Sequence, residues 1–244
     1  MLADLYQSMT RIASMKSFKV QRPGITIQGE LDVFRHKGCI IDPKIDGTHL
    51  LAHEDGLENR HGKPFSQKVT GDRGGMEWEI TRFAAAHDAV VNGELVHKPS
   101  YHTHFQAWRI VEALQNATGA IKHELRDYCT TPAPITWPVF LPFDLLQYKG
   151  EDIRRKPFIE RRALLKGMID LHVAGVGHDN NIVRDWILRW AMDADDEDSR
   201  MQSLDWEGQQ EFFGECLEGY VIKPKTSIYV GGNNRRIVRL RCFR

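Results

Sequence analysis

The chain has 244 residues, of which 41% are hydrophobic and 27% charged, and its 33 basic side chains balance its 33 acidic ones. This composition is that of an ordinary globular protein and excludes a disordered or fibrous chain. Because the net charge is zero, a nucleic-acid partner would have to meet a locally basic face. The sequence has no apolar run near the roughly 20 residues that a membrane-spanning helix needs and no secretory signal, so we expect a cytoplasmic protein with no membrane partner.

The four cysteines are scattered along the chain and include no C-x-x-C pair: Cys39, Cys129, Cys216 and Cys242. In a chain of this size that spacing predicts neither a zinc site nor a disulfide framework, and it favours reduced thiols. The histidines form no metal-spaced cluster either, and the nearest case, "YHTHF", favours a polar loop entering a helix.

The first predicted elements are two strands within residues 38–54, joined at an Asp-Gly turn. Residues 57–66 are polar and rich in turn-forming residues. Residues 76–89 carry apolar side chains at helical spacing and predict an amphipathic helix. The predicted apolar side of this helix consists of Trp78, Ile80, Phe83 and Ala84.

The middle of the chain alternates strands with helices. Residues 90–96 predict a short strand, and residues 104–117 predict an amphipathic helix. The apolar run 137–148 predicts a buried strand. Residues 158–171 predict a helix that follows Pro157, because proline is well suited to a helix start.

The last part of the chain predicts a short helix over residues 209–217 and closing strands over 218–230 and 235–243. This order of elements indicates an α+β fold in which helices pack outside two antiparallel sheets. No Pro/Gly/Ser-rich linker divides the chain, so we expect one compact domain over residues 1–244.

The segment "IIDPKIDGTH" places Lys44 between an apolar strand and an Asp-Gly turn. A lone lysine at a strand end is ordinarily a surface residue. A lysine amine is a nucleophile only when it is unprotonated, and its free pKa is about 10.4. A partly buried site crowded by other cations would lower that pKa and free the lone pair. Lys44 is therefore a candidate nucleophile.

Two glutamates lie in similar settings, since Glu94 in "VVNGELV" and Glu218 in "CLEGYVIKP" each border a glycine beside a β-rich run. Such a pair of strand-borne carboxylates suits Mg²⁺, which takes hard oxygen ligands and keeps several waters. Taken singly, either glutamate is more typical of a carboxylate on the rim of a site.

Basic residues gather near the end of the sequence: Lys223, Lys225, Arg235, Arg236, Arg239 and Arg241. Arg239 and Arg241 share one face of a strand, because side chains alternate with period two. Neighbouring guanidiniums repel each other unless an anion such as a phosphate chain lies between them. The alternative is a solvated edge strand. With Lys44 and the glutamates, these residues suggest a nucleotide whose phosphate is attacked by lysine.

Six sequence elements, in this order, resemble the nucleotidyltransferase motifs of ATP-dependent DNA ligases: "KIDGTH", "NRHGKPF", "NGELV", "LPFDLLQYKGEDI", "EGYVIKP" and "RIVRLR". They extend from residue 44 to residue 241, over most of the chain. The K-x-D-G element alone is unspecific, whereas six elements in order are specific. The resemblance implies an ATP-grasp-like nucleotidyltransferase core, the cofactors ATP and Mg²⁺, nicked duplex DNA as partner, and a bacterial or phage-encoded protein.

The resemblance also implies roles for individual residues. Lys44 is similar in position to the lysine that forms a covalent lysyl-AMP. Asp42 lies where the family usually has a glutamate that reads the adenine amino group. Arg60 matches the arginine that contacts the ribose and orients the nick phosphate. Glu94 matches a carboxylate that meets the ribose hydroxyl, and Phe143 matches the aromatic ring that stacks on adenine.

At the end of the motif set, Glu218 matches the metal-binding carboxylate, and Lys223 matches the lysine that follows E-G-x-V-x. Arg239 and Arg241 stand where the family commonly has two lysines near the α-phosphate, so they keep the charge but change the geometry. A further departure is His49, which replaces an arginine that holds the nick phosphate and is mostly neutral at pH 7.

In this family an OB-fold domain follows the last strand, and it carries a basic motif that orients pyrophosphate. The sequence stops at Arg244 and includes no such domain. The expectation is a stand-alone catalytic core, a fragment, or a protein whose partner supplies the OB-type function.

The leading hypothesis is an ATP-dependent ligase that seals 5′-phosphate/3′-hydroxyl nicks in DNA. An RNA ligase of the same superfamily is the first alternative, because Thr48 and His49 follow the motif glycine. A nucleic-acid end-binding module without turnover is the second, and a GTP-using capping enzyme shares the lysine chemistry.

Overall fold

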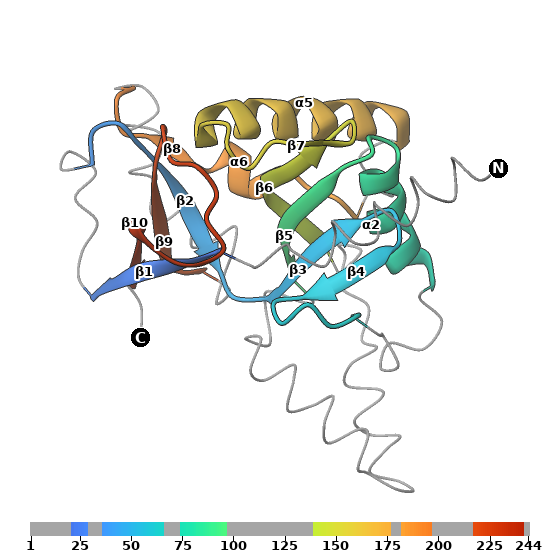
Figure 1. Ribbon diagram of the computed structural model, residues 1–244, viewed down its shortest axis with the longest axis horizontal. Helices are drawn as coiled ribbons and strands as arrows, with labels where there is room; N and C mark the ends of the chain where they lie inside the picture. The colour runs from blue at the N-terminus through green and yellow to red at the C-terminus, as the bar shows by residue number, and fades with distance from the viewer. Residues whose placement is uncertain are drawn as a thin grey trace, which may run out of the picture.

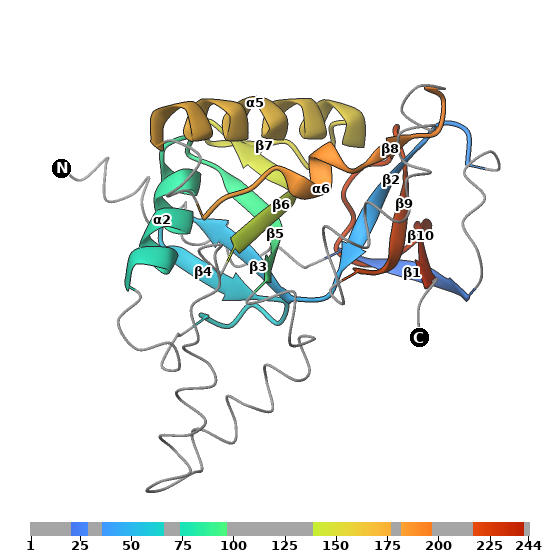
Figure 2. The same cartoon turned by 180° about the vertical axis from the view of Figure 1, so that it is seen from behind.

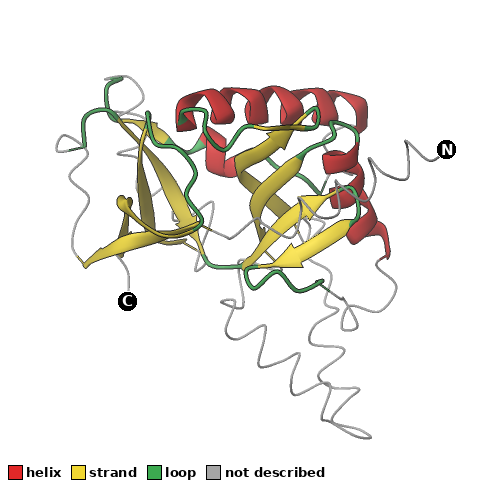
Figure 3. Cartoon of the chain, viewed as in Figure 1, coloured by secondary structure: helices red, strands yellow, loops and turns green. Residues whose placement is uncertain are grey.

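The protein is described by a computed structural model, which covers residues 21–28, 36–65, 74–96, 139–176, 182–196 and 217–241. These residues form two separate β-sheets with a small number of helices (Figure 1, Figure 3). The helix predicted over 104–117, and all but the last residue of the helix predicted over 209–217, lie outside the described residues. None of the described helices is long and apolar enough to cross a membrane.

Sheet A has five strands in the order β1-β10-β9-β2-β8. Their bounds are Gln21–Gln28 (β1), Gly232–Arg241 (β10), Leu217–Pro224 (β9), Cys39–Ile45 (β2) and Met192–Asp193 (β8). Its strand pairs are antiparallel with one exception, since β1 runs parallel to β10. The expectation of two antiparallel sheets is therefore confirmed for the rest of the sheet and wrong at this edge.

Sheet B also has five strands, in the order β4-β3-β5-β6-β7. Their bounds are Gly56–Asn59 (β4), Thr48–His53 (β3), Val90–Val96 (β5), Val139–Tyr148 (β6) and Glu151–Asp152 (β7). All four pairs in this sheet are antiparallel.

The two strands predicted within residues 38–54 both exist, but they do not form a hairpin. β2 pairs with β9 in sheet A, whereas β3 pairs with β4 and β5 in sheet B. Asp46 and Gly47 therefore carry the chain from one sheet to the other. A β-carbon on Gly47 would lie 2.6 Å from the carbonyl oxygen of Leu95, so the glycine permits a close backbone approach.

Helices α2 (Gly74–Ala85) and α5 (Phe158–Val176) pack against sheet B, and the short helix α6 (Trp186–Arg189) lies near β6 and β2 (Figure 1, Figure 2). The largest buried cluster joins both long helices to the sheet and includes Ile80, Phe83, Leu95, Met168 and Ile169. Because strand side chains alternate, the opposite face of sheet B is left to face sheet A.

Trp78 was expected on the apolar side of α2, and this is wrong: its exposed fraction is 57%, while Ile80, Phe83 and Ala84 are fully buried. Residues two apart on a helix lie about 200° apart, so Trp78 and Ile80 cannot share a face. Met76, four residues before Ile80, occupies the buried position instead.

One buried ion pair fixes α5 to sheet B. Arg161, with an exposed fraction of 1%, donates to both carboxylate oxygens of Asp144 in β6, at 2.8 and 3.0 Å. Its remaining nitrogen donates to the carbonyl oxygens of Lys156 and Ser227, at 2.6 and 3.2 Å. The side chain therefore ties together β6, the start of α5 and the segment after β9.

We predict that Arg161→Met lowers the free energy of unfolding by about 3–5 kcal/mol, because it leaves a buried carboxylate without its partner. Denaturant unfolding at neutral pH measures the change. The control is Arg155→Met, at an exposed position just before α5, which we expect to stay within about 0.5 kcal/mol of the parent protein. Equal stability of the two variants would contradict the assigned role of the pair.

Candidate active site

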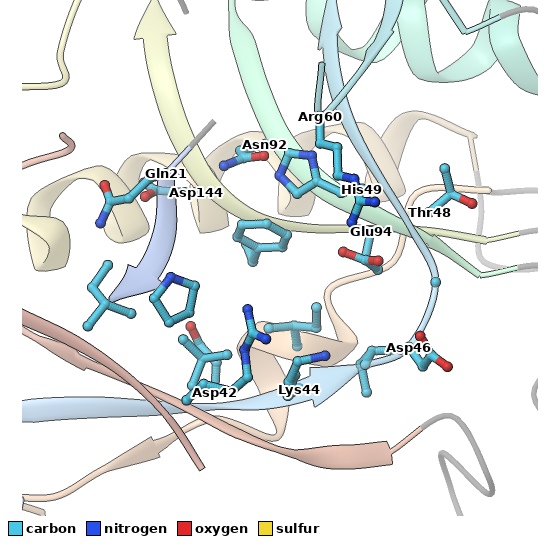
Figure 4. Close-up of a pocket in the computed structure, with 18 of the residues that line it drawn as sticks. Gln21, Asp42, Lys44, Asp46, Thr48, His49, Arg60, Asn92, Glu94 and Asp144 are labelled. Atoms are coloured by element: carbon cyan, nitrogen blue, oxygen red, sulfur yellow. The ribbon is translucent and has the colours of Figure 1, made fainter. Parts of the chain in front are cut away.

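A cavity of about 780 Å³ lies between the facing surfaces of sheets A and B (Figure 4). Asp42 and Lys44 stand on the β2 side, and Glu94, His49 and Arg60 stand opposite them. The cavity lining includes every candidate residue whose side chain is described: Asp42, Lys44, Arg60, Glu94, Phe143, Glu218, Lys223 and Arg239. The backbone of Arg241 ends β10, but its side chain lies outside the described part of the structure.

Strand alternation explains why these residues converge. In β5, Val91 and Leu95 belong to the helix-covered core, while Asn92 and Glu94 line the cavity. In β2, Asp42 and Lys44 are two residues apart and therefore share the cavity face.

The Lys44 amine forms an ion pair with the carboxylate of Glu218 on β9. The side chains are 19% and 11% exposed, so the pair is largely shielded from water but reachable from the cavity. The β2–β9 ladder pairs Lys44 with Gly219 and Ile45 with Leu217, so its register shifts at Glu218. This irregularity lets the Glu218 side chain lie on the same face as Lys44. A lysine in this setting can reach a ligand only by exchanging or sharing its carboxylate partner.

Glu94 is a half-buried carboxyl whose pKa is raised to about 8. Burial is the main cause, and the negative charge of Asp46 adds to it. Lys44, the backbone N–H of Gly47 and Arg60 act in the opposite direction without cancelling the effect. At this pKa Glu94 is largely protonated at neutral pH, and a bound cation would favour its ionised form.

The oxygen groups of the cavity fit a hard cation. Glu94 in sheet B and Glu218 in sheet A offer carboxylate oxygens, which are the ligands that Mg²⁺ prefers. Within the described residues, no three His, Cys, Asp or Glu side chains form a ready-made metal cage. This donor set matches an ion that keeps several waters and shares its coordination with substrate phosphates.

Asp42 is 2% exposed, and each of its carboxylate oxygens contacts a cation. The Nζ atom of Lys223 lies 2.9 Å from Oδ2, and a terminal nitrogen of Arg162 lies 2.7 Å from Oδ1. Burial acts to raise the pKa of Asp42, but Arg162 and Lys223 outweigh it and hold that pKa below its usual value.

Lys223 also lies over two aromatic rings, 4.9 Å from the centroid of Phe143 and 4.7 Å from that of Phe158. Phe143 faces His49 at a centroid distance of 5.8 Å and a tilt of 56°. The ring expected to stack on a nucleobase therefore lines the cavity close to both a cation and an imidazole.

The segment after β4 presents Arg60, an exposed residue, to the cavity. The side-chain oxygen of Asn59 accepts hydrogen bonds from the backbone N–H groups of His61 and Lys63, at 2.8 and 3.2 Å. The Nε of Arg60 donates to Nε2 of His61 at 3.1 Å. Hydrogen bonds involving side chains within the "NRHGK" segment thus stabilise its turn.

The basic residues near the end of the sequence separate into two groups. Lys223 and Arg239 line the cavity. Lys225 lies elsewhere and forms ion pairs with Asp193 and Asp195, at 2.6 and 2.7 Å, while Arg235 and Arg236 are exposed.

Several cavity residues escaped sequence reasoning: Gln21, Pro23, Asn92, Arg162 and Phe158 take part in the cavity or in its wall. Gln21 and Pro23 belong to β1, whose sequence has no clear alternation of apolar and polar residues over its full length. Nothing in the sequence of α5 sets Arg162 apart from the other charged residues of that helix.

The sequence model of a family described as "ATP dependent DNA ligase domain" matches residues 20–239. The chain belongs to this family. Its members are nucleotidyltransferases, so the ligase domain is that of an enzyme. No curated protein matches the chain.

Two solved structures show the same fold as this ligase domain. The mycobacterial DNA ligase D complexed with ATP and MES is 19% identical, with a TM-score of 0.50, over 90% of this chain and 60% of that one. The Chlorella virus DNA ligase-adenylate is 16% identical, with a TM-score of 0.52, over 90% of this chain and 68% of that one. The ligase domain thus spans about 60% of the length of the mycobacterial chain.

We predict that Gly47→Ala destabilises the ligase domain by about 1–3 kcal/mol, because its β-carbon would meet the Leu95 carbonyl oxygen and displace Glu94. Denaturant unfolding measures the change. The matched control is Gly167→Ala in α5, where a β-carbon has no neighbour within 4 Å and alanine favours the helix. Loss of stability in both variants would contradict the steric explanation.

We further predict a pH-dependent effect of Glu94→Gln in metal-free buffer. The folded protein keeps the Glu94 proton up to about pH 8, while the unfolded chain releases it near the ordinary glutamate pKa. The unfolded state therefore binds fewer protons between these limits, and this group destabilises the fold as pH rises. Glutamine cannot ionise, so the melting temperature of Glu94→Gln minus that of the parent should grow from pH 5 to pH 8.5. A constant difference would contradict the raised pKa.

Proposed function

We propose that the ligase domain is an ATP-dependent polynucleotide ligase that seals 5′-phosphate/3′-hydroxyl nicks in duplex DNA through a covalent lysyl-AMP. The observation that carries this proposal is the position of the Lys44 amine. It lies inside the cavity, paired with Glu218, on the same wall as the Asp42–Lys223 pair. The family match supports DNA rather than RNA as the nucleic acid.

In the first step the Lys44 amine attacks the α-phosphorus of ATP. A nitrogen–phosphorus bond forms, the bond from that phosphorus to the bridging oxygen breaks, and pyrophosphate leaves. The amine must lose a proton to act as a nucleophile. Glu218 is the carboxylate in contact with the amine and is the group placed to receive that proton.

In the following steps AMP moves from Lys44 to the 5′-phosphate of the nick, and the 3′-hydroxyl then attacks that phosphate and releases AMP. Lys223, Arg239 and Arg60 supply positive charge for the transferred group. Arg241 is proposed for the same role from its place in the motif.

The nucleotide subsite uses the remaining candidates. Phe143 offers its ring to the adenine, and Asp42 offers a hydrogen-bond acceptor to the adenine amino group. Glu94 lines the same cavity and interacts electrostatically with Lys44, so it is proposed to contact the ribose or the cation. Glu94 and Glu218 would hold Mg²⁺, which when bound stabilises negative charge on the phosphates. The expectation of a partner protein that supplies an OB-type function stays a prediction.

The test is incubation with α-labelled ATP and Mg²⁺, followed by denaturing electrophoresis. We expect the parent protein to carry label and Lys44→Ala to carry none. The control is Lys149→Ala, which removes an exposed lysine beyond β6 and should leave labelling intact. Full labelling of Lys44→Ala would refute the proposal.

Transfer separates the remaining alternatives once the protein is labelled. Nicked duplexes with DNA or RNA on the 3′-hydroxyl side should show sealing of the DNA nick. A strict requirement for RNA would indicate an RNA ligase instead, and nick binding by a protein that never takes label would indicate an end-binding module.

A further inference from the structure

Arg162 is not itself a lining residue of the cavity, but its side chain contacts Asp42, which is one. Arg162 is near the start of α5, at the end of the helix that faces sheet A (Figure 1, Figure 2). The backbone N–H of Ile159 donates to the carbonyl oxygen of Lys225 at 3.0 Å and ties this end of α5 to the end of β9. From there the Arg162 side chain, 11% exposed, contacts β2.

The Arg162 guanidinium makes two polar contacts, one with a side-chain carboxylate and one with a backbone carbonyl oxygen. One terminal nitrogen donates to Oδ1 of Asp42 at 2.7 Å, and the other donates to the carbonyl oxygen of Leu188 in α6 at 3.2 Å. A planar guanidinium held at both ends cannot rotate freely, so it fixes the plane of the carboxylate that it contacts.

Arg162 and Lys223 share two partners. Each contacts one oxygen of Asp42, and each lies over the ring of the fully buried Phe158, at 5.8 and 4.7 Å from its centroid. One carboxylate and one ring therefore join the two cations.

The charges in this set explain why two cations are present. Lys223 is a point charge on a flexible stem and could leave Asp42 for a phosphate. Arg162 would then remain as the partner that keeps the carboxylate ionised in a buried place. A carboxylate has about four lone-pair sites, and the two cations use two of them, so acceptor sites remain for a ligand.

An ionised carboxylate can only accept hydrogen bonds. A nucleobase with an amino group at its pairing edge can donate a hydrogen bond to the Asp42 carboxylate. A nucleobase with a carbonyl oxygen at that position cannot, because its oxygen and the carboxylate are both acceptors. Sites that reject an analogue through a mismatched buried polar group discriminate far more strongly than apolar pockets do.

We propose, resting on the function proposed above, that Arg162 is a positioning residue for base selection: it holds Asp42 in place as an acceptor at the nucleobase end of the cavity. The contacts described for Arg162 are with Asp42, Leu188 and Phe158, and its side chain is not part of the cavity lining that includes Lys44. Its loss should therefore affect which nucleotide is used and how tightly, more than the rate of the covalent step.

The variants are Arg162→Met, which keeps the length and removes charge and donors, and Arg162→Lys, which keeps the charge but cannot hold Asp42 and Leu188 together. The matched control is Lys166→Met, one turn further along α5, where the lysine contacts only the exposed Asp170 among the described ion pairs. Each variant is assayed for labelling of Lys44 over a range of ATP and GTP concentrations.

We expect Arg162→Met to raise the KM for ATP by roughly ten- to a hundredfold and to lower the preference for ATP over GTP by at least about tenfold, as the loss of one charged hydrogen bond implies. The maximal labelling rate should stay within about threefold of the parent. Arg162→Lys should restore part of the preference, and Lys166→Met should leave all three quantities unchanged.

A double-mutant cycle with Asp42→Asn separates positioning from general damage. If Arg162 acts through Asp42, the double variant should be no less selective than Asp42→Asn alone. Additive losses, or an unchanged ATP preference in both Arg162 variants, would overturn the proposal. If Arg162→Met does not fold, Arg162→Lys and its cycle decide.

The failure of this inference differs from the failure of the proposed function. Binding of ATP and GTP by Lys44→Ala, with and without Arg162→Met, is measured by calorimetry and needs no covalent step. A parent protein that never takes label refutes the ligase function. A parent that takes label, with Arg162 variants that bind and discriminate as it does, refutes only the role of Arg162.

Discussion

The register between β2 and β9 is the constraint on which the cavity depends. It sets Asp42 opposite Val221 and Lys44 opposite Gly219, and strand alternation puts Lys223 on the face of Asp42. A register shift between Lys44 and Ile45 brings Glu218 to the lysine. A further shift of β9 by one residue would turn its side chains to the other face of sheet A. The ladder therefore places both charge pairs at once, and the packing of sheet A against the rest of the chain preserves them.

The cavity pairs its charges internally. Lys44 pairs with Glu218, Asp42 pairs with two cations, and Glu94 keeps a proton because burial outweighs the attraction of Lys44 and Arg60. A nucleoside triphosphate with its cation would change each of these pairings.

Sequence reasoning succeeded where local pattern and tertiary structure agree. Residues 90–96 form β5 as predicted, residues 137–148 contain β6, and the helix after Pro157 is α5. The site residues converge as their motif order implied, because strand alternation turns them toward one cavity. The local sequence does not reveal which distant strands pair. Asp46 and Gly47 resemble a hairpin turn, but β2 pairs with β9, and β3 pairs with β4 and β5.

Arg162 and β1 show the same limit in two ways. A helical arginine gives no hint of the carboxylate it meets 120 residues away, and Pro23 and Gly24 interrupt the strand pattern of β1. In both cases the missing information is the identity of a distant neighbour. Trp78 is a different case, since the helical spacing itself excludes it from the buried face.

The parallel pairing of β1 with β10 has a consequence for biosynthesis. Gln21 donates its backbone N–H to the hydroxyl of Tyr229, a residue 208 positions later, and contributes to the cavity wall. Sheet B is assembled from segments that emerge earlier, whereas sheet A waits for β9 and β10 to leave the ribosome. Long-range pairing of this kind is slow. The nascent chain therefore completes this cavity only after β10 has been synthesised, and until then β1 lacks its partner strand.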